Sequence, residues 1–512
     1  MRKYIVYICS IAAFFLSNIV ALAQFPYQNT LTKEDEFVQF NTSEKVVFDK
    51  DGATLTPSTS SKGMTRGFYL NDLAFTVDRG FIIEFDYLMT GGPSSLNFAD
   101  GLALVLFNGS VAAPKMGADG SGLGYSYKTP TFSGLTEGFL AVGIDLWGSF
   151  KFRRSESGEY RNGIRNGSTN STLIADSDRL GKEGESRNHI TIRGQGNGGK
   201  GYPVLITQST TNFESRTMLN FSTGLYDKKP EAPQSTSFGF KLRENSGYYE
   251  NDIDASFGHS SYRRISIFML PGTKDGKKGF YMIVDMIHGL KTDRIIKDFF
   301  LPDNETIRYL EASSSSESSN VFSTLDLKAP ATFKLGFVGS IGGYSQRQIV
   351  RNLSLYMPFS PSVENVYLTD VCKDTPTEID VLANSVGFNN NIYTGGGDLH
   401  AYGDKKHLDP YSFQFRTIIG GLYEDTAQPY TAVTPYGTYE YNPVTTKIIF
   451  VPNKGATMPV SDQVYFTIRN KEKQLANDIN LGNEQFRSNT GTVRLTFGKN
   501  CNDVLMVNGN SI

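Results

Sequence analysis

The residues with the clearest chemical potential are two aspartates, a glycine cluster and a tryptophan. Asp100 precedes a nearly continuous apolar run, Gly101 to Phe107, and the cluster Gly120-Ser-Gly-Leu-Gly-Tyr125 follows that run. Asp145 ends a second apolar run, and Trp147, the single tryptophan of the chain, comes two residues later. A carboxylate acceptor, accessible backbone N–H groups and an aromatic face are the parts of a site that binds a small polar ligand with one apolar side.

Length and charge narrow the class of protein. The chain has 512 residues, more than one core usually contains, so we expect two domains. The net charge is -2 and the sequence pI is about 6.3, which does not indicate a phosphate-binding surface, so nucleic acid is not an expected partner. Gly (51), Tyr (27) and Phe (36) are abundant and helical periodicity is scarce, which is typical of β-sandwiches and barrels.

The N-terminus has the pattern of a cleaved signal peptide. Arg2 and Lys3 form a short basic region, Ile5 to Val20 is apolar, and Ala21-Leu-Ala23 is typical of a cleavage site. We therefore expect residues 1–23 to be removed and the mature chain to be exported to the periplasm, the cell surface or the medium. A membrane anchor is the alternative, but no stop-transfer charge cluster follows, and no later segment approaches the roughly 20 apolar residues of a membrane span.

Strand-type runs separated by turns fill residues 24–358, where we expect the larger β-sandwich domain. These runs are apolar or alternate at period two, and they predict strands at Gly80–Met89, Gly101–Phe107, Phe139–Asp145, Arg264–Leu270, Phe280–Met286, Phe333–Val338 and Ile349–Tyr356. The run Gly101–Phe107 has almost no polar residue, which predicts a strand covered on both faces.

A second β unit is expected in residues 359–512, after the break at Pro358 to Pro361. Its period-two segments predict strands at Gly437–Tyr441, Lys447–Val451, Gln463–Ile468 and Thr492–Phe497. Several short strands in this length are typical of an Ig-like sandwich. Cys372 and Cys501 bracket the unit, and in an oxidising compartment we expect a disulfide between them, with two unpaired thiols as the alternative.

Four motifs of the first domain, in matching order, resemble those of L-type (legume-type) lectins. They are Phe98-Ala-Asp-Gly-Leu-Ala-Leu-Val-Leu106, Gly120-Ser-Gly-Leu-Gly-Tyr125, Leu140-Ala-Val-Gly-Ile-Asp-Leu-Trp147, and Lys334-Leu-Gly-Phe-Val-Gly-Ser-Ile-Gly-Gly343 with Gln348-Ile-Val-Arg-Asn-Leu-Ser-Leu355. The resemblance spans roughly residues 35 to 357. It implies an all-β, concanavalin A-like jelly-roll sandwich that binds a glycan or polysaccharide and is not an enzyme.

The resemblance also implies roles for single residues. It aligns Asp100, after an unusual cis peptide bond, with the family's sugar-binding carboxylate, and Trp147 with its stacking aromatic. The backbone donor aligns near Gly120 and Gly122. The loop Gly342-Gly-Tyr-Ser-Gln346, with Gly343 and Tyr344, matches the variable specificity loop. The structural alternatives are a turn carboxylate, a core or rim aromatic and tight glycine turns.

The metal site of the family is only partly matched. Asp145 aligns with a ligand of the family's calcium and transition-metal pair, and His189 is the one candidate for its histidine, so calcium is a possible cofactor. Gly143 stands where the family has a glutamate, and Ser149 stands where it has a sugar-contacting asparagine. These departures remove one expected metal ligand and the expected sugar-contacting amide.

Two other functions stay open. A glycoside hydrolase on the same fold would need two carboxylates about 5–9 Å apart, and Asp145 has only Gly143 and Gly148 at the aligned positions. Glu84 and Asp86 alternate on Ile83 to Tyr87, and we expect them to form an exposed acidic face.

The other alternative is a structural or assembly protein of the cell surface whose lectin fold has lost sugar binding. Residues 362 to 500, with Thr377-Glu-Ile-Asp-Val-Leu-Ala-Asn384, resemble Ig-like or cadherin-like modules of bacterial surface proteins. That resemblance implies a spacer, or a docking unit for a surface-protein partner.

Overall fold

The computed structural model is nearly all β. It describes residues 27–34, 36–42, 44–58, 63–70, 74–77, 80–92, 98, 100–127, 133–151, 187–211, 216–228, 238–243, 255–310, 322–358, 360–388, 403–420, 422–471 and 487–498. Within these ranges the helical elements are two 3-10 turns, η1 (Gly120–Gly122) and η7 (Lys405–His407). None of the described helices is long and apolar enough to cross a membrane. The predicted signal peptide, residues 1–23, lies outside the described residues.

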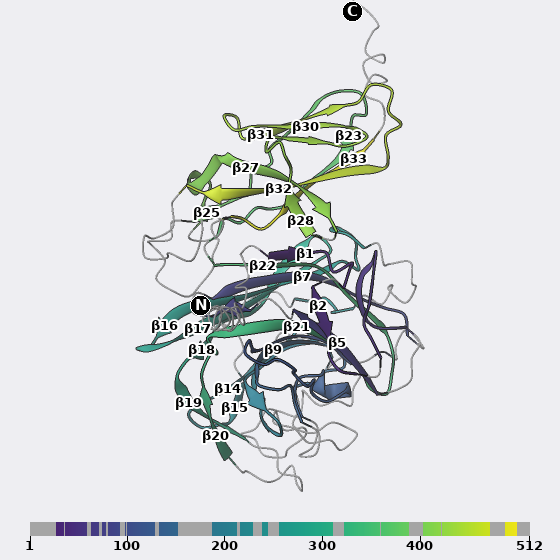
Figure 1. Cartoon of the computed structure of the whole chain (residues 1–512). Coiled ribbons are helices and arrows are strands. Elements are labelled where there is room, and N and C mark those ends of the chain that lie inside the picture. Colours follow the sequence, from purple (N-terminus) through teal and green to yellow (C-terminus); the bar gives the residue numbers. More distant parts are fainter. Residues whose placement is uncertain are drawn as a thin grey trace, which may run out of the picture.

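Two large sheets form the layers of the first unit (Figure 1). The front sheet has 12 strands: β2 (Phe37–Gln39), β5 (Met64–Leu70), β6 (Phe75–Thr76), β8 (Gly101–Asn108), β9 (Gly138–Asp145), β10 (His189–Arg193), β11 (Gly196–Asn197), β12 (Lys200–Gly201), β13 (Val204–Ser209), β14 (Thr217–Leu219), β15 (Tyr226–Lys228) and β21 (Thr332–Ile341). Its main order is β15-β14-β13-β10-β9-β8-β21-β5-β2.

The back sheet of this unit is built from β1 (Tyr27–Asn29), β3 (Val47–Asp49), β4 (Gly52–Thr56), β7 (Phe81–Thr90), β16 (Arg263–Lys274), β17 (Lys277–His288), β18 (Lys291–Pro302) and β22 (Arg347–Tyr356). A separate hairpin consists of β19 (Glu305–Leu310) and β20 (Phe322–Leu327). The predicted all-β sandwich is the one observed, and the predicted strands Arg264–Leu270 and Phe280–Met286 lie in the paired strands β16 and β17.

The main core lies between the two sheets and explains the apolar runs. Leu102, Leu104 and Leu106 of β8 and Ile265 and Ile267 of β16 are all fully buried in it. The intervening residues of β8 face the other side, where loops cover them in a second apolar cluster. The prediction that this strand is covered on both faces is confirmed.

The second unit has its own core and two sheet segments (Figure 1). One sheet contains β24 (Thr377–Ile379), β29 (Thr431–Val433), β30 (Gly437–Asn442) and β31 (Lys447–Pro452), and a short pair contains β25 (Gly387–Phe388) and β26 (Gly403–Asp404). The other segment contains β23 (Val366–Val371), β27 (Leu408–Ile419), β28 (Leu422–Asp425), β32 (Ser461–Asn470) and β33 (Gly491–Phe497). An Ig-like topology and the boundary at 358/359 stay predictions.

Backbone pairing joins the two units into one extended sheet. Strand β1 pairs with β22 on one side and, through Asn29 and Leu422, with β28 on the other. Arg416 Nη1 donates to Gln28 Oε1 at 2.6 Å across the same junction. This 13-stranded sheet therefore runs from the first core into the second.

Beside this junction, the acidic pair on β7 differs from the prediction. Arg264 on β16 binds Glu84 and Asp86 at 2.8 Å each, and Tyr262 Oη donates to Asp86 Oδ1 at 3.1 Å. Asp86 is only 5% exposed. The expectation of an exposed acidic face was wrong, because Arg264 on the neighbouring strand pairs with both acids and covers them.

One of the two cysteines of the predicted disulfide lies within the described residues. Cys372 directly follows β23 and is disulfide-bonded. Cys501 lies outside the described residues, so the pairing of the two cysteines stays a prediction.

Candidate functional site

Three neighbouring strands of the front sheet bring the predicted site residues together. Gly101, the first residue of β8, lies opposite Asp145 of β9 on one side and Ser340 of β21 on the other. The loops that leave these strand ends therefore meet at one edge of the sandwich. They carry Asp100, Trp147 and Tyr344, which sequence reasoning had assigned to one site.

Asp100 is held at the base of this edge by its backbone. Its N–H donates to the carbonyl oxygen of Ser340 at 3.0 Å, and its own carbonyl accepts from Leu146 and Trp147 at 2.9 and 3.2 Å. The residue is 6% exposed. Asp100 thus ties the start of β8 to both neighbouring loops, and the position of Trp147 depends on this link. Ala99 lies outside the described residues, so the predicted cis bond is not placed.

Glycines surround the Asp100 carboxylate. A Cβ atom at Gly342 would lie 2.8 Å from Asp100 Oδ2, and one at Gly120 would lie 3.8 Å from the same atom. A side chain at Gly342 would therefore displace the carboxylate. Of the two predicted backbone donors, Gly120 lies beside the Asp100 carboxylate. The N–H of Gly122 instead donates to the carbonyl of Asp119 at 3.1 Å.

Two aromatic rings lie beside the carboxylate. The ring centroids of Trp147 and Tyr344 are 5.6 Å apart at an interplanar angle of 47°, and the guanidinium of Arg187 lies 4.2 Å from the centroid of Trp147. Trp147 is half-buried and Tyr344 is 37% exposed. A Cβ at Gly343 would meet open space. We call Asp100, Gly342, Trp147 and Tyr344 the Asp100 patch.

A buried arginine connects two of these loops. The guanidinium of Arg243 lies 4.3 Å from the ring centroid of Phe98, donates to Gln346 Oε1 at 3.1 Å and donates to the carbonyl of Gly91 at 2.6 Å. Burial lowers the pKa of Arg243 to about 10, so the side chain keeps its charge at neutral pH. Since Phe98 is two residues from Asp100, and Gln346 two from Tyr344, Arg243 positions both.

The loop from Asp145 to Lys151, which we call the Lys151 loop, closes on itself. Asp145 Oδ1 accepts from the N–H of Gly148 and Oδ2 from the N–H of Phe150, each at 2.8 Å. Gly148 has a φ of 86°, a conformation that glycine adopts readily. Ser149 is 4% exposed inside this turn. Both oxygens of the predicted metal ligand therefore organise the turn.

The second predicted ligand, His189, lies directly opposite Asp145 across the β9–β10 pair. The ammonium of Lys151 lies 2.6 Å from His189 Nε2, and His189 Nδ1 lies 3.0 Å from Thr207 Oγ1. Lys151 and His189 are both fully buried. Burial, and then the charge of Lys151, lower the pKa of His189 well below its ordinary value.

The missing glutamate also has a structural reason. A Cβ at Gly143 would lie 2.5 Å from the Phe150 ring, so any side chain there would overlap that ring. Arg193 holds Phe150 from the other side, with Nε donating to the carbonyl of Phe150 at 2.9 Å and Nη1 donating to the carbonyl of Tyr202 at 2.6 Å. Phe150 thus occupies the volume next to Gly143.

These residues do not fit the metal that the family resemblance implies. Asp145 uses both oxygens on loop amides, Lys151 faces the imidazole nitrogen of His189, and Phe150 fills the space at Gly143. Across the described ranges, no three His, Cys, Asp or Glu side chains are grouped as metal ligands. The predicted calcium therefore has no described set of ligands.

Sequence reasoning assembled the Asp100 patch but missed its supports, Lys151, Phe150, Arg187, Arg193 and Arg243. One signal was present for Lys151, which lies between two phenylalanines in Ser-Phe-Lys-Phe, a context unusual for an exposed lysine. The partners of the three arginines are mainly carbonyl groups and aromatic rings, and these leave no pattern in the sequence.

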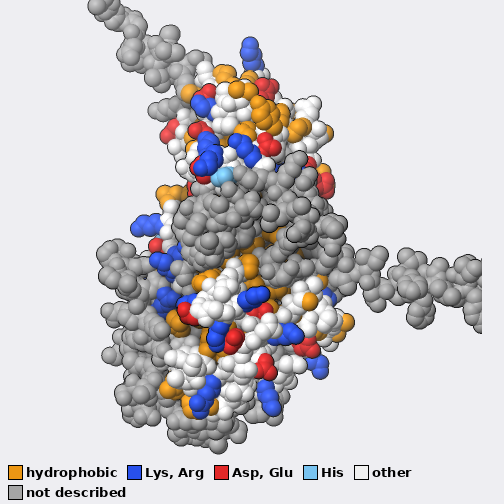
Figure 2. All heavy atoms as spheres, turned by 90° about the vertical axis from the view of Figure 1, so that its left-hand side faces the viewer, with side chains coloured by type: hydrophobic (Ala, Val, Ile, Leu, Met, Phe, Trp, Pro, Cys, Tyr) orange, Lys and Arg blue, Asp and Glu red, His pale blue; other side chains and the backbone are white. Residues whose placement is uncertain are grey.

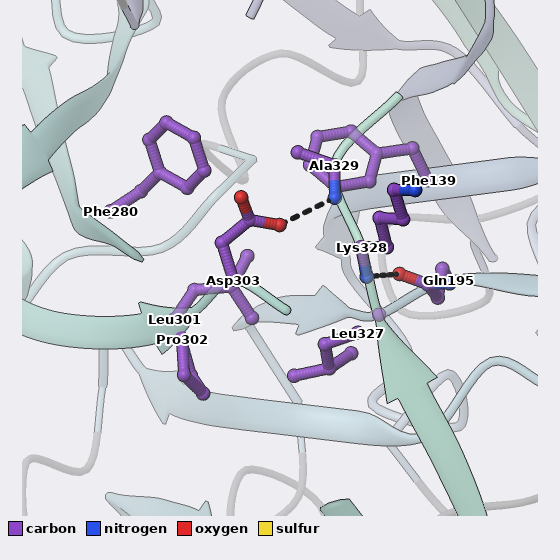
Figure 3. Close-up of a pocket in the computed structure, with 10 residues that line it drawn as sticks. Phe139, Gln195, Phe280, Leu301, Pro302, Asp303, Leu327, Lys328 and Ala329 are labelled. Carbon is purple, nitrogen blue, oxygen red and sulfur yellow. Dashed lines mark hydrogen bonds between the residues drawn. The ribbon is translucent and has the colours of Figure 1, made fainter. Parts of the chain in front are cut away.

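A small pocket lies at the opposite end of β9 (Figure 3). Its cavity volume is about 10 Å³, and its lining includes Phe139, Phe280 and Asp303, with the N–H of Ala329 donating to Asp303 Oδ1 at 2.8 Å. Phe139 is six residues before Asp145, which puts the pocket about 20 Å from the Asp100 patch. It is smaller than typical ligand pockets of about 300–1,000 Å³.

The comparisons with known proteins give structural matches only. No protein-family model and no curated protein sequence matches the chain. Similar solved structures include the exoplasmic/lumenal domain of VIP36 in its Ca²⁺/Man3GlcNAc-bound form, at 8% identity and a TM-score of 0.30, covering 65% of this chain and 90% of that one.

Two further matches are lectin I-B4 of Griffonia simplicifolia in its metal-free form (14% identity, TM-score 0.30, 65% and 97% covered) and the legume lectin-like domain from Entamoeba histolytica (11% identity, TM-score 0.28, 63% and 90% covered). These neighbours are legume lectin-like domains. A likeness of this extent carries no argument about ligand, metal or mechanism.

Proposed function

We propose that the chain is a non-catalytic glycan-binding protein whose site is the Asp100 patch. The observation that carries the proposal is the meeting of a backbone-held carboxylate with two aromatic rings at one strand edge. Asp100 lies at the base, and Trp147 and Tyr344, with centroids 5.6 Å apart, form the rim.

The arrangement suits the chemistry of a sugar. Vicinal hydroxyls donate to a carboxylate, and the apolar face of the ring packs on an aromatic side chain. Gly342 leaves room above the carboxylate, because any Cβ there would lie 2.8 Å from Asp100 Oδ2. On the face seen in Figure 2, basic and acidic side chains of the described residues are interspersed, with no field of one sign that would select a polyanion.

A glycan array with neutral and acidic oligosaccharides tests the proposal on the purified full chain. We expect saturable binding that Asp100→Asn and Tyr344→Ala each weaken by at least roughly tenfold, the effect of losing about 1.4 kcal/mol of binding free energy. Tyr411→Ala is the matched control, since Tyr411 is 66% exposed on the second unit. No binding by folded protein, or equal binding by all variants, would refute the Asp100 patch as a glycan site.

A second candidate function is a structural or assembly component of the cell surface. Arg187 lies 4.2 Å from the centroid of the Trp147 ring and covers part of the platform that a sugar would use. Strand β1 also links the two units, since it pairs with β22 of the first and β28 of the second. A structural component that transmits force between its units would need such a link. An array without binding, together with capture of a defined surface-protein partner that removal of the second unit abolishes, would favour this function.

The proposed setting is outside the cytoplasm. The sequence pattern of residues 1–23 supports export, and the disulfide bond of Cys372 is typical of an oxidising compartment. N-terminal sequencing of protein recovered from the periplasm or medium should begin at Gln24. An intact N-terminus in the cytoplasmic fraction would contradict export.

A further inference from the structure

The Lys151 loop contains a buried positive charge at the place where the family resemblance implies a metal. Asp145 and His189 face each other across two paired strands, and the chain returns from Asp145 to place the Lys151 ammonium 2.6 Å from His189 Nε2. All three residues are fully buried. We propose that the Lys151 ammonium is a built-in replacement for the metal ion, and that Lys151 is a positioning residue for Trp147.

The hydrogen-bond chemistry defines the direction of this contact. An ammonium can only donate, so His189 must accept through Nε2 and carry its proton on Nδ1, which then donates to Thr207 Oγ1 at 3.0 Å. Thr207 is in turn 2.7 Å from Thr191 Oγ1. The imidazole lone pair that a metal would use is therefore already bound to a cation of this chain.

The rest of the volume is filled as well. Phe150 stands against Gly143 at a distance that excludes a side chain there, and Arg193 binds the Phe150 carbonyl with Nε at 2.9 Å. Two side-chain cations, Lys151 and Arg193, thus hold the loop in which Asp145 accepts two backbone N–H groups. A bound divalent ion could enter only if Lys151 left.

The loop connects this charge to the Asp100 patch. Trp147 lies between Asp145 and Lys151, and its N–H donates to the carbonyl of Asp100 at 3.2 Å. An ammonium on the same chain is always present, whereas a metal must be bound from solution. The consequence, which rests on the proposed glycan site, is that glycan binding needs no calcium and persists in chelator.

The first test needs no glycan, because Trp147 is the single tryptophan of the chain and its fluorescence reports the Lys151 loop. For the full wild-type chain we expect no calcium, manganese or zinc by elemental analysis. Its Trp147 emission and melting temperature should not change with EDTA, calcium or manganese. A stoichiometric metal, or an emission shift on EDTA that calcium reverses, would overturn the proposal even if every variant failed to fold.

The second test removes the charge and keeps the length of the side chain. We expect Lys151→Met to shift Trp147 emission to longer wavelength and to increase its quenching by acrylamide. The matched control is Lys334→Met, since Lys334 is also buried (8% exposed) but lies six residues from Ser340 on β21. Wild-type emission in Lys151→Met would overturn the proposal. Because these readouts do not involve a ligand, a negative glycan array refutes the proposed function and leaves this inference standing.

Discussion

The Asp100 patch and the Lys151 loop lie side by side at one edge of the front sheet, but the rim of the patch is exposed whereas the charged groups of the loop are fully buried. In the loop, Asp145 and Lys151 are fully buried, as is His189 on β10: Asp145 accepts two loop N–H groups, and the Lys151 ammonium lies 2.6 Å from His189 Nε2. In the patch, Tyr344 is 37% exposed, and the adjoining Gly343 lies next to open space. The comparison teaches that one strand edge can present an open aromatic surface while the volume beside it is filled by buried side chains.

The difference has an energetic meaning. Buried charges cost several kcal/mol each unless partners compensate them, so residues of the loop should matter mainly for stability. Exposed residues of the patch make few internal contacts, so their replacement should change stability by no more than about 0.5 kcal/mol and act mainly on binding.

The largest effect is expected where the family glutamate is restored. Gly143→Glu would force a side chain into the Phe150 ring, which is 2.5 Å from the new Cβ, and would bury a carboxylate. We expect the free energy of unfolding to fall by at least about 3 kcal/mol, measured by urea denaturation. Phe150→Ala alone should cost about 3–5 kcal/mol through the cavity it leaves.

The double variant sharpens this prediction. If Phe150 occupies the glutamate's volume, Gly143→Glu should cost about 1–3 kcal/mol less in the Phe150→Ala background than in wild type. Additive costs would show that the Phe150 ring and a side chain at position 143 do not compete for the same volume. The Lys151 loop could then not be described as filled by Phe150.

A middle-sized effect is expected at Asp145. Asp145→Asn keeps the shape but leaves one oxygen for two backbone N–H groups, so we expect a loss of about 2 kcal/mol in unfolding free energy and a shift in Trp147 emission. Asp404→Asn is the matched control, because its carboxylate accepts the N–H of Lys406 at 2.9 Å and pairs with Lys406 Nζ at 3.0 Å, both on an exposed turn. Equal, small losses in both variants would argue against a structural role for Asp145.

The fold was predictable because its signals are local and periodic. The runs at Phe139–Asp145 and Gly101–Phe107 have the composition of buried strands, and β9 and β8 span nearly the same residues. Asp100, Trp147 and Tyr344 were grouped by the resemblance of their motifs, and each lies next to a strand end. The partner of Glu84 and Asp86 could not, since Arg264 lies on a strand far away in sequence and pairs with them only after the sheet forms.

The supports of the site were not predictable for the same reason. Lys151 and His189 are separated by residues 152–188, and only the pairing of β9 with β10 brings them together. Gly143 suggested a lost ligand, but the ring that replaces it, Phe150, is identified only by its distance. Sequence therefore predicted which residues form the surface and not what holds them.

The smallest effect on stability, and the sharpest on binding, is expected at Gly342. Gly342→Ala would place a methyl group 2.8 Å from Asp100 Oδ2, so the carboxylate must move, while unfolding free energy should change by less than about 1 kcal/mol. Gly343→Ala is the matched control, because it adds the same methyl group at the adjacent residue, where the methyl group meets open space. On a glycan array we expect a much larger loss of affinity for Gly342→Ala. Equal losses would mean that the loop surface, and not the Asp100 carboxylate, determines binding.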